Sequence, residues 1–109
     1  MISVESGGAK GEWELESGRL RLSGILDDNN ILGIRQWGER QIKAGVAEGM
    51  SGLIIDLAEL ESAQSQVLSL LLCWIRSANG KGSDVKIENA PLKLQEVARV
   101  SGLDAFLLL

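Results

Sequence analysis

Ser65 occupies a position in this sequence that suits it for chemistry or for contact with another molecule. Residues 62–66 are polar and lie between an apolar run, residues 53–57, and a helical pattern of apolar residues that begins at Val67. Ser65 therefore falls at the N-terminus of a predicted helix, where backbone N–H groups lack partners and the helix dipole favours negative charge. Its hydroxyl could cap the helix, contact a partner or accept a phosphate. We expect the function to reside at this helix start.

Four carboxylates, Asp27, Asp28, Asp56 and Glu59, are the other candidates for chemistry. A pair of carboxylates can act as general acid and base, or it can bind magnesium. Acidic residues at helix starts and strand ends are also common as caps and as partners of helix dipoles. Because the sequence supplies no partner that would perturb them, we interpret these four residues as structural.

The residue types that hydrolytic and zinc enzymes need are missing. The sequence contains no histidine, and its single cysteine, Cys73, lies in an apolar helical segment and has no partner for an internal disulfide. A serine nucleophile would lack its usual base, and a zinc site would lack ligands. Residues 80–83, Gly-Lys-Gly-Ser, differ from a phosphate loop in the order of glycine and lysine and follow a helix. We predict no enzymatic activity, no metal and no cofactor, with a nucleotide-binding module as the weakest alternative.

Small side chains recur at every fourth residue after Ser65, at Ser69, Cys73 and Ser77. They lie as a stripe along one side of the predicted helix. Such a stripe could let another backbone approach closely, or it could be an ordinary strip that faces solvent, and both interpretations stay open.

Composition and charge favour a protein partner. The chain of 109 residues is 45% apolar and 24% charged, typical of one globular domain, and has neither a membrane-spanning run nor a signal-peptide pattern. Its net charge of −4 and the lack of a Lys/Arg cluster argue against nucleic acid or anionic lipid as the primary partner. We therefore expect a soluble, cytoplasmic protein that is not inserted in the membrane and that acts on another protein.

The predicted core is built on residues 53–57 and the helix that follows them. The run Leu-Ile-Ile-Asp-Leu is too apolar for a strand with one wet face, so we expect it to be covered on both faces of a central sheet. The apolar arc of the next helix is wider than packing on one sheet requires, because Leu68, Leu72 and Trp74 cannot all face that sheet. Some of that arc needs a second cover, and a partner could supply it.

The other elements follow from hydrophobic periodicity. Residues 12–16 and 19–22 predict a β-hairpin around Ser17-Gly18, and we expect its four apolar side chains to point into the core: Trp13, Leu15, Leu20 and Leu22. The apolar periodicity that starts at Ile31 predicts a first helix. Its glycines, Gly33, Gly38 and Gly45, require that packing rather than propensity stabilise it.

The C-terminal third of the chain is predicted to form a strand and a helix. Residues 84–88 alternate like a strand, and Pro91 opens a third helix that ends near Gly102 and packs through the apolar residues Leu92, Leu94, Val97, Ala98 and Val100. We expect residues 1–11 to be a flexible lead-in and residues 12–109 to form one domain, with residues 103–109 undecided between strand and helix. The predicted fold is an α/β sandwich of order ββαβαβα, a four- to five-stranded mixed sheet with helices packed against it.

The combination of these segments resembles the STAS domain, named for sulfate transporters and anti-sigma factor antagonists. The resemblance rests on Leu-Ser-Gly-Ile-Leu-Asp at residues 22–27, on Leu-Ile-Ile-Asp-Leu at residues 53–57 and on the serine-containing stretch at residues 62–68. Residues 89–103 are similar to the last helix of the family and its following turn. The match covers most of residues 12–107.

Within that family, residues 68–75 are most similar to the small stand-alone STAS proteins of the MlaB type in Gram-negative bacteria. The resemblance implies a non-enzymatic subunit that docks on the ATPase subunit of an Mla-type ABC transporter for phospholipid, and that reaches the inner membrane through that partner. The implied contact residues lie at the start of the second helix: Ser65, Gln64, Gln66, Leu68, Ser69 and Leu72. The loop after the second predicted strand, with Asp27 and Asp28, is implied as a neighbour.

The family implies a second function for the same site. In an anti-sigma factor antagonist, a serine kinase would modify Ser65 and so control binding to an anti-sigma factor. Gln64 stands where the family usually has aspartate, and Gln66 and Val67 replace the small pair that follows. These departures favour a constitutive transporter subunit over a phosphorylation switch.

Overall fold

The structure, a computed structural model, describes residues 2–50, 52–61, 65–80 and 84–102. Its elements follow in the order β1 (Ile2–Ser6), β2 (Ala9–Glu14), β3 (Arg19–Gly24), α1 (Ile31–Ala47), β4 (Gly52–Asp56), α2 (Ser65–Asn79), β5 (Asp84–Glu88) and α3 (Leu92–Val100). The strands form one mixed sheet in the order β1-β2-β3-β4-β5, antiparallel from β1 to β3 and parallel from β3 to β5. The predicted class, a mixed α/β sheet with helices packed against it, is confirmed.

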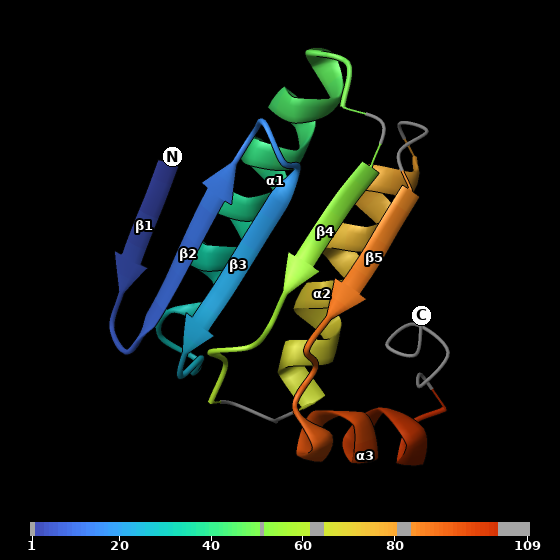
Figure 1. Ribbon diagram of the computed structural model, residues 1–109. Coiled ribbons are helices and arrows are strands. Elements are labelled where there is room, and N and C mark those ends of the chain that lie inside the picture. The colour runs from blue at the N-terminus through green and yellow to red at the C-terminus, as the bar shows by residue number, and fades with distance from the viewer. Residues whose placement is uncertain (1, 51, 62–64, 81–83, 103–109) are drawn as a thin grey trace.

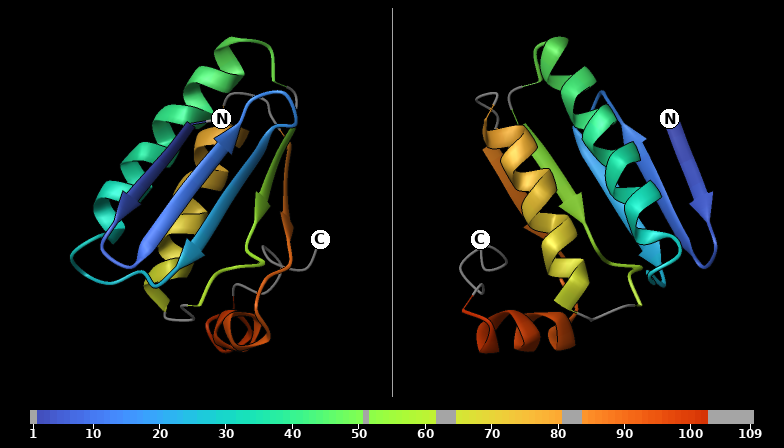
Figure 2. Two further views of the ribbon diagram at one scale, coloured as in Figure 1. Left: turned by 60° about the vertical axis from the view of Figure 1, so that its left-hand side comes forward. Right: turned by 180° about the vertical axis from the view of Figure 1, so that it is seen from behind.

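Both long helices lie side by side on one face of the sheet, and α3 lies across the end of the sheet near β5 (Figures 1 and 2). The expectation that residues 53–57 are covered on both faces is therefore wrong. Leu53 and Ile55 are buried beneath the helices, whereas Ile54 lies on the open face and is only half-buried. Its neighbours across the ladder are Arg19 and Lys86, whose aliphatic stems can shelter an apolar side chain on a wet face.

The N-terminal stretch is part of the sheet, which corrects the expectation that residues 1–11 are a flexible lead-in. β1 pairs with β2 over its whole length, from Ile2 opposite Trp13 to Ser6 opposite Ala9. The turn between them uses Gly7, whose φ of 58° favours glycine. Gly7 and Gly8 thus form the turn of a tight hairpin.

The predicted hairpin between β2 and β3 is confirmed, with Trp13 opposite Leu20 and Glu14 opposite Arg19. Trp13, Leu20 and Leu22 are buried as expected. Leu15 is 43% exposed, contrary to prediction, because β2 ends at Glu14 and Leu15 lies in the turn that follows. Alternation therefore predicted the strand correctly but extended it too far.

The core is organised by close packing of tryptophan against glycine. A Cβ added at Gly11 would overlap the ring of Trp37, and one at Gly38 would overlap that of Trp74. A Cβ at Gly45 would lie in tight contact with Trp13, at 3.0 Å. Two of these glycines lie within α1, so the propensity cost of glycine in this helix is offset by the close approach it permits. A Cβ at Gly33 would have no neighbour within 4 Å among the residues that the structure describes.

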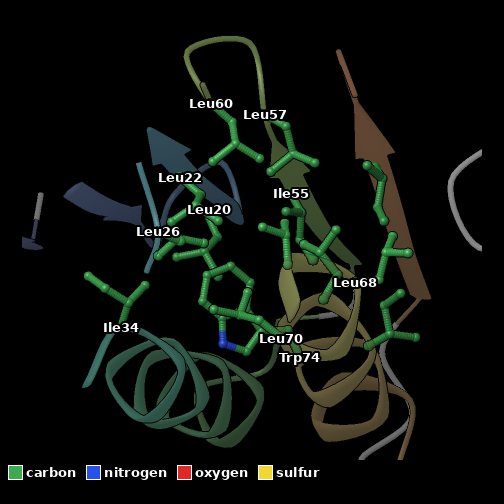
Figure 3. Packing of buried hydrophobic residues seen from close by; sticks show 14 of the residues in the cluster. Leu20, Leu22, Leu26, Ile34, Ile55, Leu57, Leu60, Leu68, Leu70 and Trp74 are labelled. Carbon is green, nitrogen blue, oxygen red and sulfur yellow. The ribbon is translucent and has the colours of Figure 1, made fainter. Parts of the chain in front are cut away.

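The wide apolar arc of α2 is covered within the domain. Trp74 is fully buried, and its indole Nε1–H donates a 3.0 Å hydrogen bond to the backbone carbonyl of Arg35 in α1. Leu68 is 4% exposed and points into the core (Figure 3), while Leu72 is half-buried. The second cover that α2 requires is supplied by α1, so the width of the arc does not by itself call for a partner.

The third helix covers the residues that its apolar pattern predicted, but not all of its apolar side chains pack against the core. Leu94 and Ala98 are buried and Val97 is partly buried, but Leu92 and Val100 are 77% and 88% exposed and do not pack as expected. The helix ends at Val100, and Gly102 follows with a φ of 75°, as the predicted stop requires. Residues 103–109, whose conformation the sequence left undecided, lie outside the described residues.

Candidate functional site

The candidate site lies at the edge of the sheet where β3 and β4 end and where α1 and α2 begin (Figure 1). The loops that follow the two strands are joined through Gly24. Its N–H donates to the carbonyl of Glu59 at 3.0 Å, and its carbonyl accepts from the N–H of Glu61 at 2.9 Å. The loop that carries Asp27 and the loop that leads to Ser65 thus start from neighbouring points on one edge.

The loop before α1 is fixed by a network of its own side chains. Asp27 Oδ1 accepts hydrogen bonds from the N–H groups of Asn29 and Asn30, at 2.8 and 3.1 Å. The Oδ1 of the buried Asn30 accepts a hydrogen bond from the N–H of Asp27, and its Nδ2 donates to the carbonyls of Ser6 and Ile25. Asp27 therefore organises the start of α1, as the structural interpretation of the carboxylates expected, while Asp28 is exposed.

Ser65 is the first residue of α2 and is exposed to solvent. Because the helix begins there, Ser65 occupies its first turn. Gln64 lies outside the described residues. The first turn of α2 carries no acidic residue, so the positive end of the helix dipole has no side-chain charge to oppose it there. An anionic group on or near Ser65 would be electrostatically favoured.

The structure separates the residues that the sequence grouped as one contact surface. Ser65 and Ser69 are exposed, and Gln66 and Leu72 are half-buried. Leu68 faces the core and is inaccessible to a partner, so its assignment to the contact surface is wrong. The physical reason is that Leu68 lies on the side of α2 that faces the sheet. The periodicity of apolar residues gives the width of the apolar side of a helix, but it does not tell which of those residues stay accessible at its border.

A cleft of about 210 Å³ lies between the beginnings of α1 and α2. Its lining comes from both helices: Ile31, Leu32 and Arg35 from α1, and Gln66, Ser69, Leu70 and Cys73 from α2. Leu32 is 53% exposed, although it is a large apolar residue on the outer side of α1. The sequence interpretation missed the α1 side of this cleft, and the available signal was an apolar residue on an otherwise polar helix face.

The stripe of small side chains follows this cleft. Ser65 and Ser69 are exposed, and Cys73 and Ser77 are half-buried. Ser69 and Cys73 contribute to the cleft wall, where their small side chains leave room between the helices. The stripe is therefore partly a groove wall rather than only a solvent-facing strip.

Asp56 is committed to an ion-pair cluster on the open face of the sheet. Its carboxylate lies 3.0 Å from Arg19 and 3.7 Å from Arg21, and it also accepts from the N–H of Ala58 and the amide of Asn89. Burial raises the pKa of Asp56, but the bonds from Ala58 and Asn89 and the charge of Arg19 outweigh it and lower that pKa below its usual value. The group is held ionised as a structural anchor, as expected.

The remaining chemical candidates stay isolated. Glu59 is exposed, and among the described residues no three of the side chains that commonly bind metals lie together. Residues 81–83 of the superficial phosphate loop lie outside the described residues, as do residues 62–64 before α2. Within the described part of the chain, no helix is long and apolar enough to cross a membrane.

Comparison with known proteins identifies the family. A family model described as "Mlab, STAS domain" matches residues 10–109. The chain belongs to the STAS domain family. A solved structure titled "Structure of the Anti-Sigma Factor Antagonist SpoIIAA in its Unphosphorylated Form" is similar to this STAS domain with a TM-score of 0.66 and 22% sequence identity, over 83% of this chain and 76% of that one. At that identity the likeness confirms the STAS fold. A search of curated proteins gave no match.

Proposed function

We propose that this STAS domain is a non-enzymatic interaction subunit of an Mla-type ABC transporter for phospholipid. In this role it docks, through the start of α2, on the cytoplasmic ATPase subunit and is held at the inner membrane by that partner. The observation that carries the proposal is the match of a family model described as MlaB over nearly the whole chain. STAS domains act through protein partners, and the folded domain offers an accessible surface at the expected end of the sheet.

The cleft beside Ser69 gives this proposal a physical basis. A volume of about 210 Å³ exceeds the roughly 150 Å³ of an apolar cavity that can hold a benzene-sized group. The cleft could therefore accept one large apolar side chain of a partner. Burying such a side chain fully contributes about 1.5–3 kcal/mol. The exposed Leu32 would be covered at the same time.

Size-exclusion chromatography of the domain with the ATPase subunit at micromolar concentration tests the proposal. We expect the two proteins to elute together, and separate elution would contradict the proposed function. Because Cys73 is the single cysteine of the sequence and lies in the cleft wall, its rate of alkylation reports whether the partner covers this site. We expect alkylation to slow in the complex.

A matched control locates the interface. In a Cys73→Ser background, Lys86→Cys places one thiol on the open face of the sheet, where Lys86 is exposed. That thiol should react equally fast with and without the ATPase subunit. Protection of the thiol at position 86 but not of Cys73 would place the interface on the sheet and move it away from α2.

A second function rests on the exposure of Ser65 at the first turn of α2. A phosphate there would add a charge of about −1.5 to −2 at the helix end that favours negative charge. It would also change the charge and shape of the surface that a partner contacts. An anti-sigma factor antagonist controlled in this way would yield a phosphopeptide containing Ser65 after incubation with its serine kinase. Absence of that peptide, together with binding to the ATPase subunit, would exclude the switch.

A further inference from the structure

The two long helices differ in charge from the rest of the chain. α1 and α2 together carry four basic side chains, Arg35, Arg40, Lys43 and Arg76, and one acidic side chain, Glu39. Their net charge is +3, whereas the whole chain carries −4, so the remaining residues carry −7. The outer helical surface is therefore basic on an acidic protein.

Most of these basic groups have no ion-pair partner in the described part of the chain. Arg35 lies 3.2 Å from Glu39 on the same helix. Arg40, Lys43 and Arg76 are exposed, and no carboxylate among the described residues lies within ion-pair distance of them. Their charge is available to an approaching molecule.

Two of these groups extend the faces that border the cleft. Lys43 follows Leu32 by eleven residues, or about three turns, and Arg76 follows Ser69 by seven, or about two turns, so each pair shares a helix face. At a rise of about 1.5 Å per residue, Arg76 lies about 10 Å beyond Ser69 along α2, and Lys43 lies about 16 Å beyond Leu32 along α1. The surface thus combines an apolar cleft at one end with free positive charge farther along.

We propose that this surface, defined by the cleft together with Lys43 and Arg76, binds an acidic protein segment. The segment would place one large apolar side chain in the cleft and carboxylates two to three helical turns farther along α1 and α2. This inference rests on the proposed function, since it specifies the chemistry of the partner surface that meets the start of α2. The first turn of α2 carries no acidic residue, and the positive end of the helix dipole there favours the same sign of charge.

Charge complementarity selects a protein segment over a membrane. Electrostatic attachment to anionic lipid uses clusters of about four to eight Lys/Arg residues. Only three basic groups of the helical face lack an ion-pair partner among the described residues, and they are spread over two helices. The rest of the chain, at −7, would be repelled by an anionic surface. A segment that contacts only α1 and α2 avoids that repulsion and also fills the cleft.

A pair of synthetic helical peptides tests the inference without the natural partner. Both carry one leucine as the apolar anchor, followed two and three turns later by glutamates in one peptide and by lysines in the other. Titration into the ¹⁵N-labelled domain, followed by NMR, should shift the amides of Leu32, Ser69 and Cys73. We expect the glutamate peptide to bind about tenfold more tightly at low salt, with the difference lost at high salt.

Two charge reversals of equal size provide the matched control. Lys43→Glu should remove the preference for the glutamate peptide, whereas Lys86→Glu, which changes an exposed lysine on the open sheet face, should preserve it. Equal affinity for the two peptides would overturn the inference, as would amide shifts confined to the sheet. Tighter binding to phosphatidylglycerol vesicles than to uncharged vesicles, lost in Lys43→Glu, would assign the surface to membranes and also overturn it.

The same variants distinguish this inference from the proposed function. If the ATPase subunit binds and Lys43→Glu binds it as well as the parent does, the acidic-segment inference fails while the transporter function stands. If the ATPase subunit does not bind but the glutamate preference depends on Lys43, the transporter function fails while the inference stands.

Discussion

On the open face of the sheet, Lys10, Arg19, Arg21 and Lys86 each lie within 4.0 Å of at least one carboxylate. On the outer face of α1 and α2, only Arg35 has such a neighbour among the described residues. The sheet face uses its charges internally, in a ladder of ion pairs that runs across all five strands. On the helical face, three of the four basic side chains, Arg40, Lys43 and Arg76, have no ion-pair partner among the described residues. Charge on the first face should therefore govern stability, and charge on the second should govern binding.

The largest effect should come from removing the anchor of the sheet face. Asp56→Ala removes a buried carboxylate that accepts hydrogen bonds from Arg19 and Asn89, which should lower the free energy of unfolding by about 2–3 kcal/mol. Urea denaturation of parent and variant would measure this. If the comparison of faces is right, the folded variant should bind the ATPase subunit as the parent does, and a loss of affinity at unchanged stability would contradict it.

The packing beneath the helical face should be nearly as sensitive. Gly38→Ala introduces a methyl group where the Trp74 ring lies, and the resulting overpacking should cost about 1–3 kcal/mol. Gly33→Ala is the matched control on the same helix, because nothing lies near a Cβ there, and it should be neutral or stabilise by up to about 1 kcal/mol. Equal effects of the two substitutions in thermal denaturation would show that Trp74 does not hold α1 against α2.

The sheet face should also determine the response to acid. The pKa of Asp56 is lower in the folded protein than its ordinary value of 3.8, so its ionised form stabilises the fold above that pH. This contribution should be lost as the pH falls from about 4 through the lower pKa of the folded state. Urea titrations between about pH 6 and pH 3 should therefore show a steeper loss of stability in the parent than in Asp56→Asn. Parallel curves would remove Asp56 as the acid-sensitive group.

A substitution at Ser65 should have the smallest effect on stability and a clear effect on binding. Ser65→Glu places a carboxylate in the first turn of α2, where the helix dipole should make it neutral or stabilising by about 0.3–1 kcal/mol. The new carboxylate would repel an acidic partner segment. Burying that carboxylate in the interface without a counter-ion would cost further binding free energy. We expect a melting temperature close to that of the parent and weaker binding to the ATPase subunit.

Ser65→Ala is the neutral control for that variant. If Ser65 affects only the helix, any change should appear in stability, at no more than the roughly 0.5–2 kcal/mol of a capping residue, with partner affinity unchanged. A Ser65→Glu variant that melts and binds like the parent would place Ser65 outside the interface.

The sequence by itself determined the fold class and most of the elements. Alternation around Ser17-Gly18 predicted the hairpin, and the apolar periodicity after Ser65 predicted α2, because both patterns come from the local geometry of strand and helix. It also placed Ser65 correctly at the start of α2. β1 escaped prediction because Ile2 and Val4 are only two alternating apolar residues, and pairing with β2 stabilises a strand that its own sequence barely specifies.

Only the tertiary structure decided which residues of α2 a partner can reach. Leu68 and Ser69 are neighbours in the sequence, yet one is buried against the sheet and the other lines a cleft with Leu32 of α1. The helical pattern gives the width of an apolar arc but not which neighbour covers it, because that depends on how α1 packs through Gly38 and Trp74. Likewise, the net charge of −4 concealed a basic helical face, since a sum over the chain contains no information about where the charges lie.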